Sequence, residues 1–109
     1  MGQKLTTHDA YRAIASPSRR VILNLLRDGE RSVGDIVGAV EMSQPAVSQH
    51  LRVLTHAGLV RDRREGRARI YQLNPEPLRE VYDWLGHYEQ FWRERFDALG
   101  MYLEEGPDE

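Results

Sequence analysis

A helix-forming stretch that runs straight into an arginine-rich hairpin sets the strongest limit on the fold. Residues 43–54 read Ser-Gln-Pro-Ala-Val-Ser-Gln-His-Leu-Arg-Val-Leu, and residues 57–71 read Ala-Gly-Leu-Val-Arg-Asp-Arg-Arg-Glu-Gly-Arg-Ala-Arg-Ile-Tyr. The first segment has the spacing of a short helix with one apolar and one polar face, and Gly66 marks a tight turn between two strands. This pair suits the placement of a helix in a DNA groove beside a basic hairpin that grips phosphates.

Length and charge agree with one small domain that faces a polyanion. The 109 residues contain no cysteine, which excludes disulfides, thiolate metal ligands and thiol redox switches. Up to residue 75 there are twelve Lys and Arg against seven Asp and Glu, whereas from residue 76 onward there are three against ten. The net charge of −2 therefore combines a basic part that can face phosphate with an acidic part that can face away from it.

Four short helices are expected before the hairpin. They are predicted at about residues 7–15, 17–27, 33–40 and 44–57. Ser16, Ser32 and Ser43 each precede one of them as an N-cap candidate, because a serine hydroxyl can accept a hydrogen bond from a free backbone N–H group. The apolar stripe predicted for the second helix consists of Val21, Ile22, Leu25 and Leu26. The brief linker between the third and fourth helices indicates a helix-turn-helix unit.

The rest of the chain is predicted to form the hairpin and one long helix. The strands are expected at 59–64 and 68–73, and the helix at 77–103 with apolar residues three or four apart. Such a helix carries more apolar surface than a domain this small can cover alone. Residues 1–103 are thus expected to form a single domain that binds DNA and dimerises, followed by a frayed acidic tail at 104–109. No membrane span or signal-peptide pattern is found, so a cytoplasmic protein is expected.

The polar face of the fourth helix allows two interpretations, base contact and mere solvation. Base contact is favoured because no acidic residue lies between Ser43 and Arg61, and a carboxylate there would repel phosphate. The hairpin carries five arginines in nine residues, which favours a phosphate clamp over an ordinary charged ribbon. The candidate DNA-contacting residues are Ser43, Gln44, Pro45, Ser48, Gln49, Arg52, Arg63, Arg64, Arg67 and Arg69.

Three further arginines have more than one predicted role. Some of the hairpin arginines, Arg61 foremost, can pair within the hairpin with Asp62 or Glu65 instead of binding phosphate. Arg19 and Arg20, near the start of the second helix, either touch phosphate or form salt bridges.

These segments resemble the ArsR/SmtB family of winged helix-turn-helix regulators. The resemblance is carried by 15–23 (Ala-Ser-Pro-Ser-Arg-Arg-Val-Ile-Leu), by 32–36 (Ser-Val-Gly-Asp-Ile), by 43–54 and 57–60, and by the hairpin residues 63–75. It covers nearly the whole chain and implies a mainly α fold of about five helices with a two-stranded antiparallel wing. It also implies a bacterial, sequence-specific DNA-binding transcriptional regulator. Most such proteins are repressors released by a metal ion or a small molecule.

The resemblance further implies a homodimer, joined through the first and last helices, on a roughly palindromic double-stranded operator. Two-fold symmetry would place paired recognition helices about one DNA turn, ~34 Å, apart. The expected dimer-interface residues are Tyr11, Ile14, Leu78, Leu85, Tyr88, Trp92, Phe96 and Leu99. A transcriptional activator of the same fold and a winged-helix protein-interaction module are the alternatives.

Most of the metal-binding residues by which members of the resembling family sense an effector are missing from this sequence. The third helix lacks the cysteines of thiol-based metal sensors in the resembling family, and Asp83 is not followed by the expected Asp-x-His histidine. The remaining metal candidates for nickel or zinc are His8, Asp83 and His87, and the Asp83–His87 pair can equally be a helix-stabilising contact. The aromatic residues from Tyr88 onward either fill the dimer interface or line a small-molecule pocket.

Catalysis is not expected. Ser48 and His50 lie two residues apart on a helix and therefore point in different directions, so they form no nucleophile–base pair. The sequence also shows no glycine-rich phosphate loop and no paired carboxylates.

Overall fold

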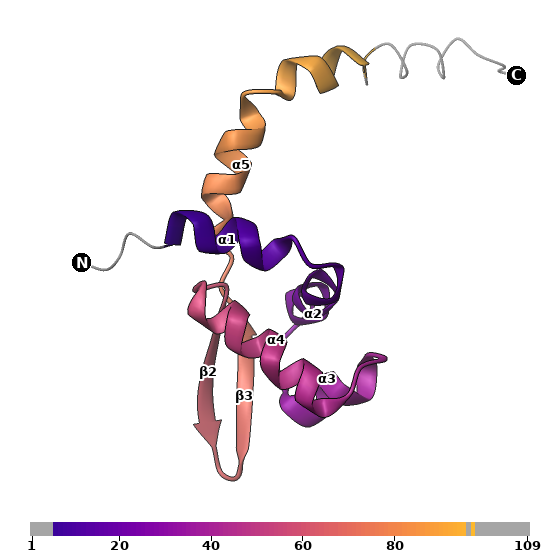
Figure 1. Cartoon of the computed structure of the whole chain (residues 1–109), viewed down its shortest axis with the longest axis vertical. Coiled ribbons are helices and arrows are strands. Elements are labelled where there is room, and N and C mark those ends of the chain that lie inside the picture. The colour runs from indigo at the N-terminus through magenta and orange to yellow at the C-terminus, as the bar shows by residue number, and fades with distance from the viewer. Residues whose placement is uncertain (1–5, 96, 98–109) are drawn as a thin grey trace, which may run out of the picture. The chain divides into compact units, whose positions relative to one another are not determined.

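A computed structural model describes residues 6–95 and 97 of the protein, with side chains described from residue 9 onward. Its elements are α1 (Thr6–Ile14), α2 (Pro17–Arg27), β1 (Arg31–Ser32), α3 (Val33–Ala39), α4 (Gln44–His56), β2 (Val60–Glu65), β3 (Ala68–Leu73) and α5 (Leu78–Gly86) (Figure 1). The mainly helical fold with an antiparallel hairpin is confirmed. Its contacts divide the chain into two units, Met1–Arg79 and Glu80–Glu109. The single-domain assignment of residues 1–103 stays a prediction, and residues 104–109 lie outside the described part.

The starts of three helices follow from serine capping. The Oγ atoms of Ser16, Ser32 and Ser43 accept hydrogen bonds from the backbone N–H three residues later, at 3.2, 3.1 and 3.2 Å. In α2 and α4 a proline also occupies the first turn, where its missing N–H leaves no helical bond unmade. The predicted N-caps are therefore confirmed.

The core of the first unit lies where α1, α2, α3 and α4 meet the base of the hairpin. Its buried residues are Ala13, Ile22, Leu23, Leu26, Ile36, Val47, Leu51, Leu54, Ala57, Leu59 and Val60. The stripe predicted for α2 was wrong at one position, because Val21 is 47% exposed and Leu23 is buried instead. Val21, Ile22 and Leu23 are three consecutive apolar residues, which allows two neighbouring registers of the apolar stripe, and packing against α4 and the other elements selects one.

The sheet has three strands in the order β1-β3-β2, one more than the sequence predicted. The hairpin strands pair antiparallel from Val60 opposite Leu73 to Glu65 opposite Ala68. The additional strand, β1, pairs Arg31 with Tyr71 and Ser32 with Ile70. Two residues are too few to show an alternating pattern, so the sequence alone could not predict this strand. It forms through its pairing with β3.

In the second unit, the predicted continuous helix at 77–103 is wrong. The helix α5 ends at Gly86, residues 87–88 form a turn, and helix resumes at 89–95. At the break the N–H groups of His87 and Tyr88 bond the carbonyls three residues back, at 3.1 and 2.9 Å. Glycine disfavours a helix interior by about 1 kcal/mol relative to alanine, which accounts for the position of the break. None of the helices in the described part is both long and apolar enough to cross a membrane.

Candidate nucleic-acid interface

The helix α4 separates its side chains into a buried face and an exposed face. Val47, Leu51 and Leu54 are at most 1% exposed and pack into the core. The exposed residues on the other side are Gln44, Pro45, Ser48, Gln49 and Arg52, here called the recognition face. Amide, hydroxyl and guanidinium groups can donate to or accept from base edges in a major groove. The sequence therefore predicted correctly which face of α4 is free.

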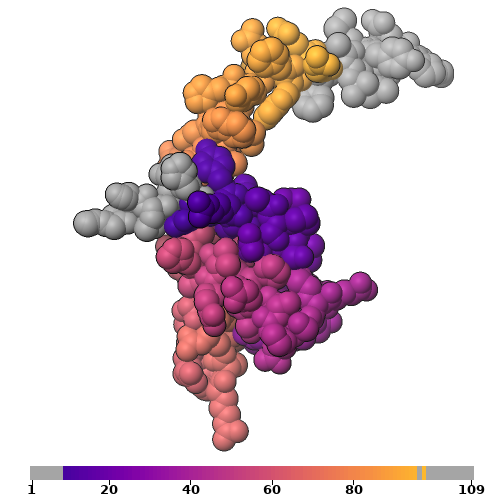
Figure 2. Space-filling view, in the orientation of Figure 1, coloured from indigo at the N-terminus to yellow at the C-terminus, as the bar shows by residue number. Residues whose placement is uncertain are grey.

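The hairpin of β2, β3 and the turn at Gly66, here called the wing, projects beyond the helices of the first unit (Figures 1 and 2). Gly66 has φ +65°, a left-handed conformation that suits glycine at a tight turn. All residues from 61 to 69 are exposed. The wing thus presents its arginines to solvent.

Two of the four predicted wing anchors are already paired with carboxylates. Arg63 donates to both oxygens of Glu30, at 2.8 and 2.9 Å, and to Glu65 at 3.3 Å. Arg69 donates to Asp62 at 2.6 Å. The hydrogen bonds with Glu30 hold the pKa of Arg63 above its usual value, and the same bonds lower the pKa of Glu30. A phosphate that binds either arginine must compete with a carboxylate.

The other two anchors are available. Arg64 and Arg67 form no ion pair with any residue in the described ranges 6–95 and 97. The prediction that some hairpin arginines pair with Asp62 or Glu65 is confirmed, but the choice of Arg61 was wrong, because these carboxylates pair with Arg69 and Arg63. The wing arginines that can bind phosphate without first leaving a carboxylate are thus Arg61, Arg64 and Arg67.

A groove of about 400 Å³ lies between the recognition face and the wing. Ser48, Arg52, Thr55, His56, Asp62 and Tyr71 line it. Thr55 and Tyr71 were not among the candidates from sequence, because neither residue type signals DNA contact by itself. Burial and the charge of Asp62 raise the pKa of Tyr71, so its hydroxyl keeps its proton and can donate.

The two arginines at the start of α2 have a role that the sequence did not suggest. Arg20 donates to the carbonyl of Ile14 at 2.6 Å, and Arg19 donates to the carbonyls of Ala13 and Arg12 at 2.8 and 3.1 Å. Both guanidinium groups therefore cap the C-terminal end of α1, where the helix dipole favours a cation. Neither of the roles predicted for them, phosphate contact or a salt bridge, describes these contacts.

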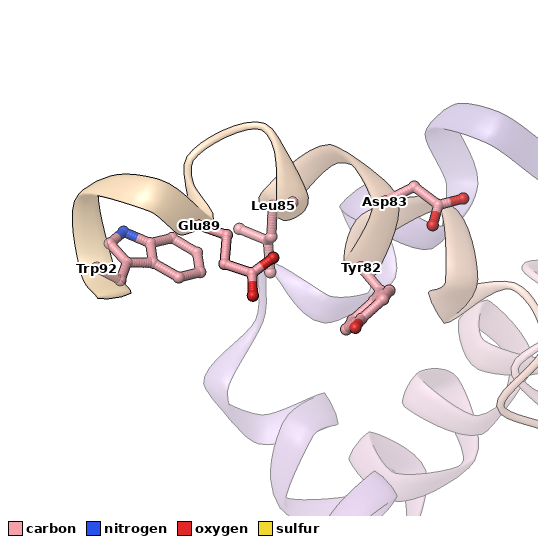
Figure 3. Close-up of a pocket in the computed structure, with 6 residues that line it drawn as sticks. Tyr82, Asp83, Leu85, Glu89 and Trp92 are labelled. Carbon is pink, nitrogen blue, oxygen red and sulfur yellow. The ribbon is translucent and has the colours of Figure 1, made fainter. Parts of the chain in front are cut away.

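The second unit carries the largest exposed apolar side chains. Tyr82, Trp84, Tyr88, Phe91 and Trp92 are between 41% and 75% exposed. Tyr82 and Trp92 line a groove of about 350 Å³ together with Asp83, Leu85, Gly86 and Glu89. In this groove Glu89 and Trp92 lie close together beyond the turn, while Asp83 points away from them (Figure 3).

The predicted dimer-interface residues fall into three groups. Tyr88 and Trp92 are exposed, whereas Tyr11 and Leu85 are half-buried. Ile14 and Leu78 pack against the core of their own chain. Phe96 and Leu99 lie outside the described residues.

The metal candidates are not brought together. Asp83 lies in α5, but His87 lies in the turn after it, where its Nδ1 is 3.1 Å from the carbonyl oxygen of Trp84. The prediction that both lie on one continuous helix is therefore wrong. Among the residues that the structure describes, no group of three His, Asp or Glu side chains could hold a metal ion. The side chain of His8 is outside the described part.

Comparison with known proteins defines the family. Residues 16–62 match the family described as "Bacterial regulatory protein, arsR family". The chain is 38% identical over 100 residues to the HTH-type transcriptional regulator Rv2034 of Mycobacterium tuberculosis, which covers 91% of each protein. The chain belongs to the ArsR family. It is also 36% identical over 78 residues to the transcriptional repressor SdpR of Bacillus subtilis, covering 72% of this chain and 87% of SdpR.

Solved structures share the fold. One crystal structure of an ArsR family transcriptional regulator superposes with a TM-score of 0.71 at 28% identity, covering 85% of this chain and 97% of that one. HlyU from Vibrio cholerae superposes with a TM-score of 0.63 at 33% identity, covering 81% and 98%. As an ArsR protein, this chain is a winged-helix, DNA-binding transcriptional regulator and not an enzyme.

Proposed function

We propose that this ArsR protein binds its operator by placing the recognition face of α4 in the major groove. Gln44, Ser48, Gln49 and Arg52 contact base edges, and Ser43 and Pro45 set the start of the helix against the DNA backbone. Of the wing arginines, Arg64 and Arg67 contact phosphates directly, whereas Arg63 and Arg69 contact phosphates in competition with the carboxylates of Glu30 and Asp62. The observation that carries this proposal is the exposed recognition face, which has no acidic side chain and borders a groove shared with the wing.

We propose further that the working form is a homodimer on a roughly palindromic operator. The exposed aromatic side chains of the second unit support this, since Tyr82 is 75% and Phe91 63% exposed. Large apolar side chains gathered on one surface usually mark a protein interface. Two-fold symmetry would then space the half-sites about 10 base pairs apart.

The proposed direction of control is repression that an effector relieves. Repression is favoured because SdpR and the SmtB of Mycobacterium tuberculosis are both named repressors. A reporter gene placed behind the operator tests the direction, since a repressor lowers expression and an activator raises it.

Base readout is tested with Gln49→Ala against operators selected from a random DNA library. The variant should lose discrimination at one base position, at a cost of about 1–3 kcal/mol on the preferred sequence. Asn24→Ala is the matched control, because Asn24 is an exposed amide on α2 outside the recognition face. An equal loss on every sequence would contradict base readout. Failure of the wild type to bind any duplex at low salt would favour a protein-interaction module.

A metal effector is tested by calorimetric titration of nickel and zinc. Among the residues that the structure describes, Asp83 and His87 have no third ligand beside them, so a site at this pair would need at least one ligand from elsewhere, such as a second copy. The wild type is compared with the double variant Asp83→Ala/His87→Ala. Unchanged binding in the variant removes these residues from the sensor, and no binding in either protein directs the search to small organic molecules.

A further inference from the structure

Arg19 links two helices that carry different parts of the proposed function. Its Nε and Nη2 atoms donate to the carbonyls of Ala13 and Arg12, at the end of α1. Its Nη1 atom lies 3.4 Å from Nδ1 of His50, in the middle of α4. One half-buried guanidinium therefore joins the C-terminal end of α1 to the recognition helix.

His50 occupies the border between the two faces of α4. It lies between the exposed Gln49 and the buried Leu51, and its own side chain is half-buried. A directional contact at this border resists rotation of the helix about its axis, in addition to the packing of its apolar face. The directions in which Gln49 and Ser48 point depend on that rotation.

The contact requires a neutral imidazole. A guanidinium has no acceptor, so Nδ1 of His50 must accept and the ring proton must sit on Nε2. Burial, and then the charge of Arg19, lower the pKa of His50, which keeps the ring neutral near pH 7. The pair is thus a directional hydrogen bond and not an ion pair.

We propose that Arg19 and His50 are positioning residues that fix the rotation of α4 and thereby its discrimination between operator and other DNA. This inference rests on the proposed base readout by the recognition face. Arg19 carries the constraint from α1 through two carbonyls, so a displacement of α1 would change how α4 presents Gln49. The proposed role does not require either side chain to contact DNA.

Two matched substitutions separate positioning from mere stabilisation. In His50→Asn the amide oxygen occupies nearly the place of Nδ1 and keeps the acceptor, whereas His50→Leu has a similar shape and no acceptor. Arg19→Lys keeps the charge but loses the planar fork that bonds two carbonyls and the imidazole together. Each protein is first shown to be folded at the assay temperature by urea denaturation.

The measured quantity is the ratio of affinities for a selected operator and for a scrambled duplex. His50→Leu and Arg19→Lys should lower this ratio about tenfold, comparable to the loss of one good base contact, with affinity for the scrambled duplex unchanged. His50→Asn should restore most of the ratio. A role in stability alone would leave the ratio of the folded proteins unchanged, and ratios equal to that of the wild type in both variants would overturn the inference.

The same assay distinguishes this inference from the proposed function. If Gln49→Ala leaves the ratio unchanged, base readout by the recognition face is itself wrong. If Gln49→Ala lowers the ratio while His50→Leu and Arg19→Lys do not, base readout stands and the positioning role fails.

Discussion

Removal of Arg67 should change how DNA affinity depends on salt without changing which sequence is preferred. Arg67 lies at the tip of the wing, is exposed, and forms no ion pair within residues 6–95 and 97. Its guanidinium can therefore bind phosphate without first leaving a carboxylate. Each phosphate neutralised on duplex DNA contributes about 0.9 to the slope of log affinity against log salt.

The expected magnitude follows from one lost phosphate contact. In Arg67→Ala the magnitude of the slope should fall by about 0.9. A fourfold rise in salt should then weaken DNA binding by the variant by a factor that is about 3.5 times smaller than the factor for the wild type. The assay is fluorescence anisotropy with a labelled operator at four salt concentrations. Arg27→Ala, which removes an exposed arginine from α2, is the control and should keep the wild-type slope. An unchanged slope in Arg67→Ala, or the same change in Arg27→Ala, would refute the role of the wing tip.

Three further predictions concern the Glu30–Arg63 ion pair on the wing and the core beneath α4. Glu30→Gln should raise the affinity for all duplexes at low salt and steepen the salt slope, because Arg63 then binds phosphate without first leaving the Glu30 carboxylate. Unchanged binding would show that Arg63 does not contact the DNA. Since the pKa of Glu30 is lowered from 4.5, the contribution of its ion pair to stability is fully present above pH 4.5 and is lost as the pH falls through the depressed value. The difference in unfolding free energy between wild type and Glu30→Gln should therefore be constant above pH 4.5 and shrink below it, as urea denaturation can measure. Leu51→Ala should lower the free energy of unfolding by about 2–5 kcal/mol, because Leu51 is 1% exposed; a loss below about 1 kcal/mol would mean that α4 is not anchored by its apolar face.

Local chemistry made the recognition face predictable. Ser43 and Pro45 define the start of α4, and the spacing of Val47, Leu51 and Leu54 defines its buried side. Both signals act within one or two helical turns, so the sequence contains all that is needed. The same holds for the turn at Gly66, where a left-handed backbone favours glycine.

Contacts between distant segments were not predictable in this way. Glu30 and Arg63 are 33 residues apart, and only the pairing of β1 with β3 and of β3 with β2 brings them together. The bond from Arg19 to His50 likewise spans 31 residues. A charge pattern along the chain indicates which arginines exist, but the fold decides which of them are already paired.

The break after α5 shows a third limit. Hydrophobic spacing continues smoothly through Gly86, so periodicity alone predicts an unbroken helix. The single glycine costs little in a helix that is packed on its neighbours and more in one whose aromatic side chains are exposed, as Tyr82 and Phe91 are.

The most direct test of the central claim is a nuclear magnetic resonance titration of the protein with a duplex selected from random DNA. Backbone amide shifts should change at residues 43–56 of α4 and at residues 60–73 of the wing, with the largest changes around Gln49 and Arg67. Shift changes confined to residues 78–95, with α4 and the wing unaffected, would contradict the assignment of the recognition face and the wing as the DNA-binding surface.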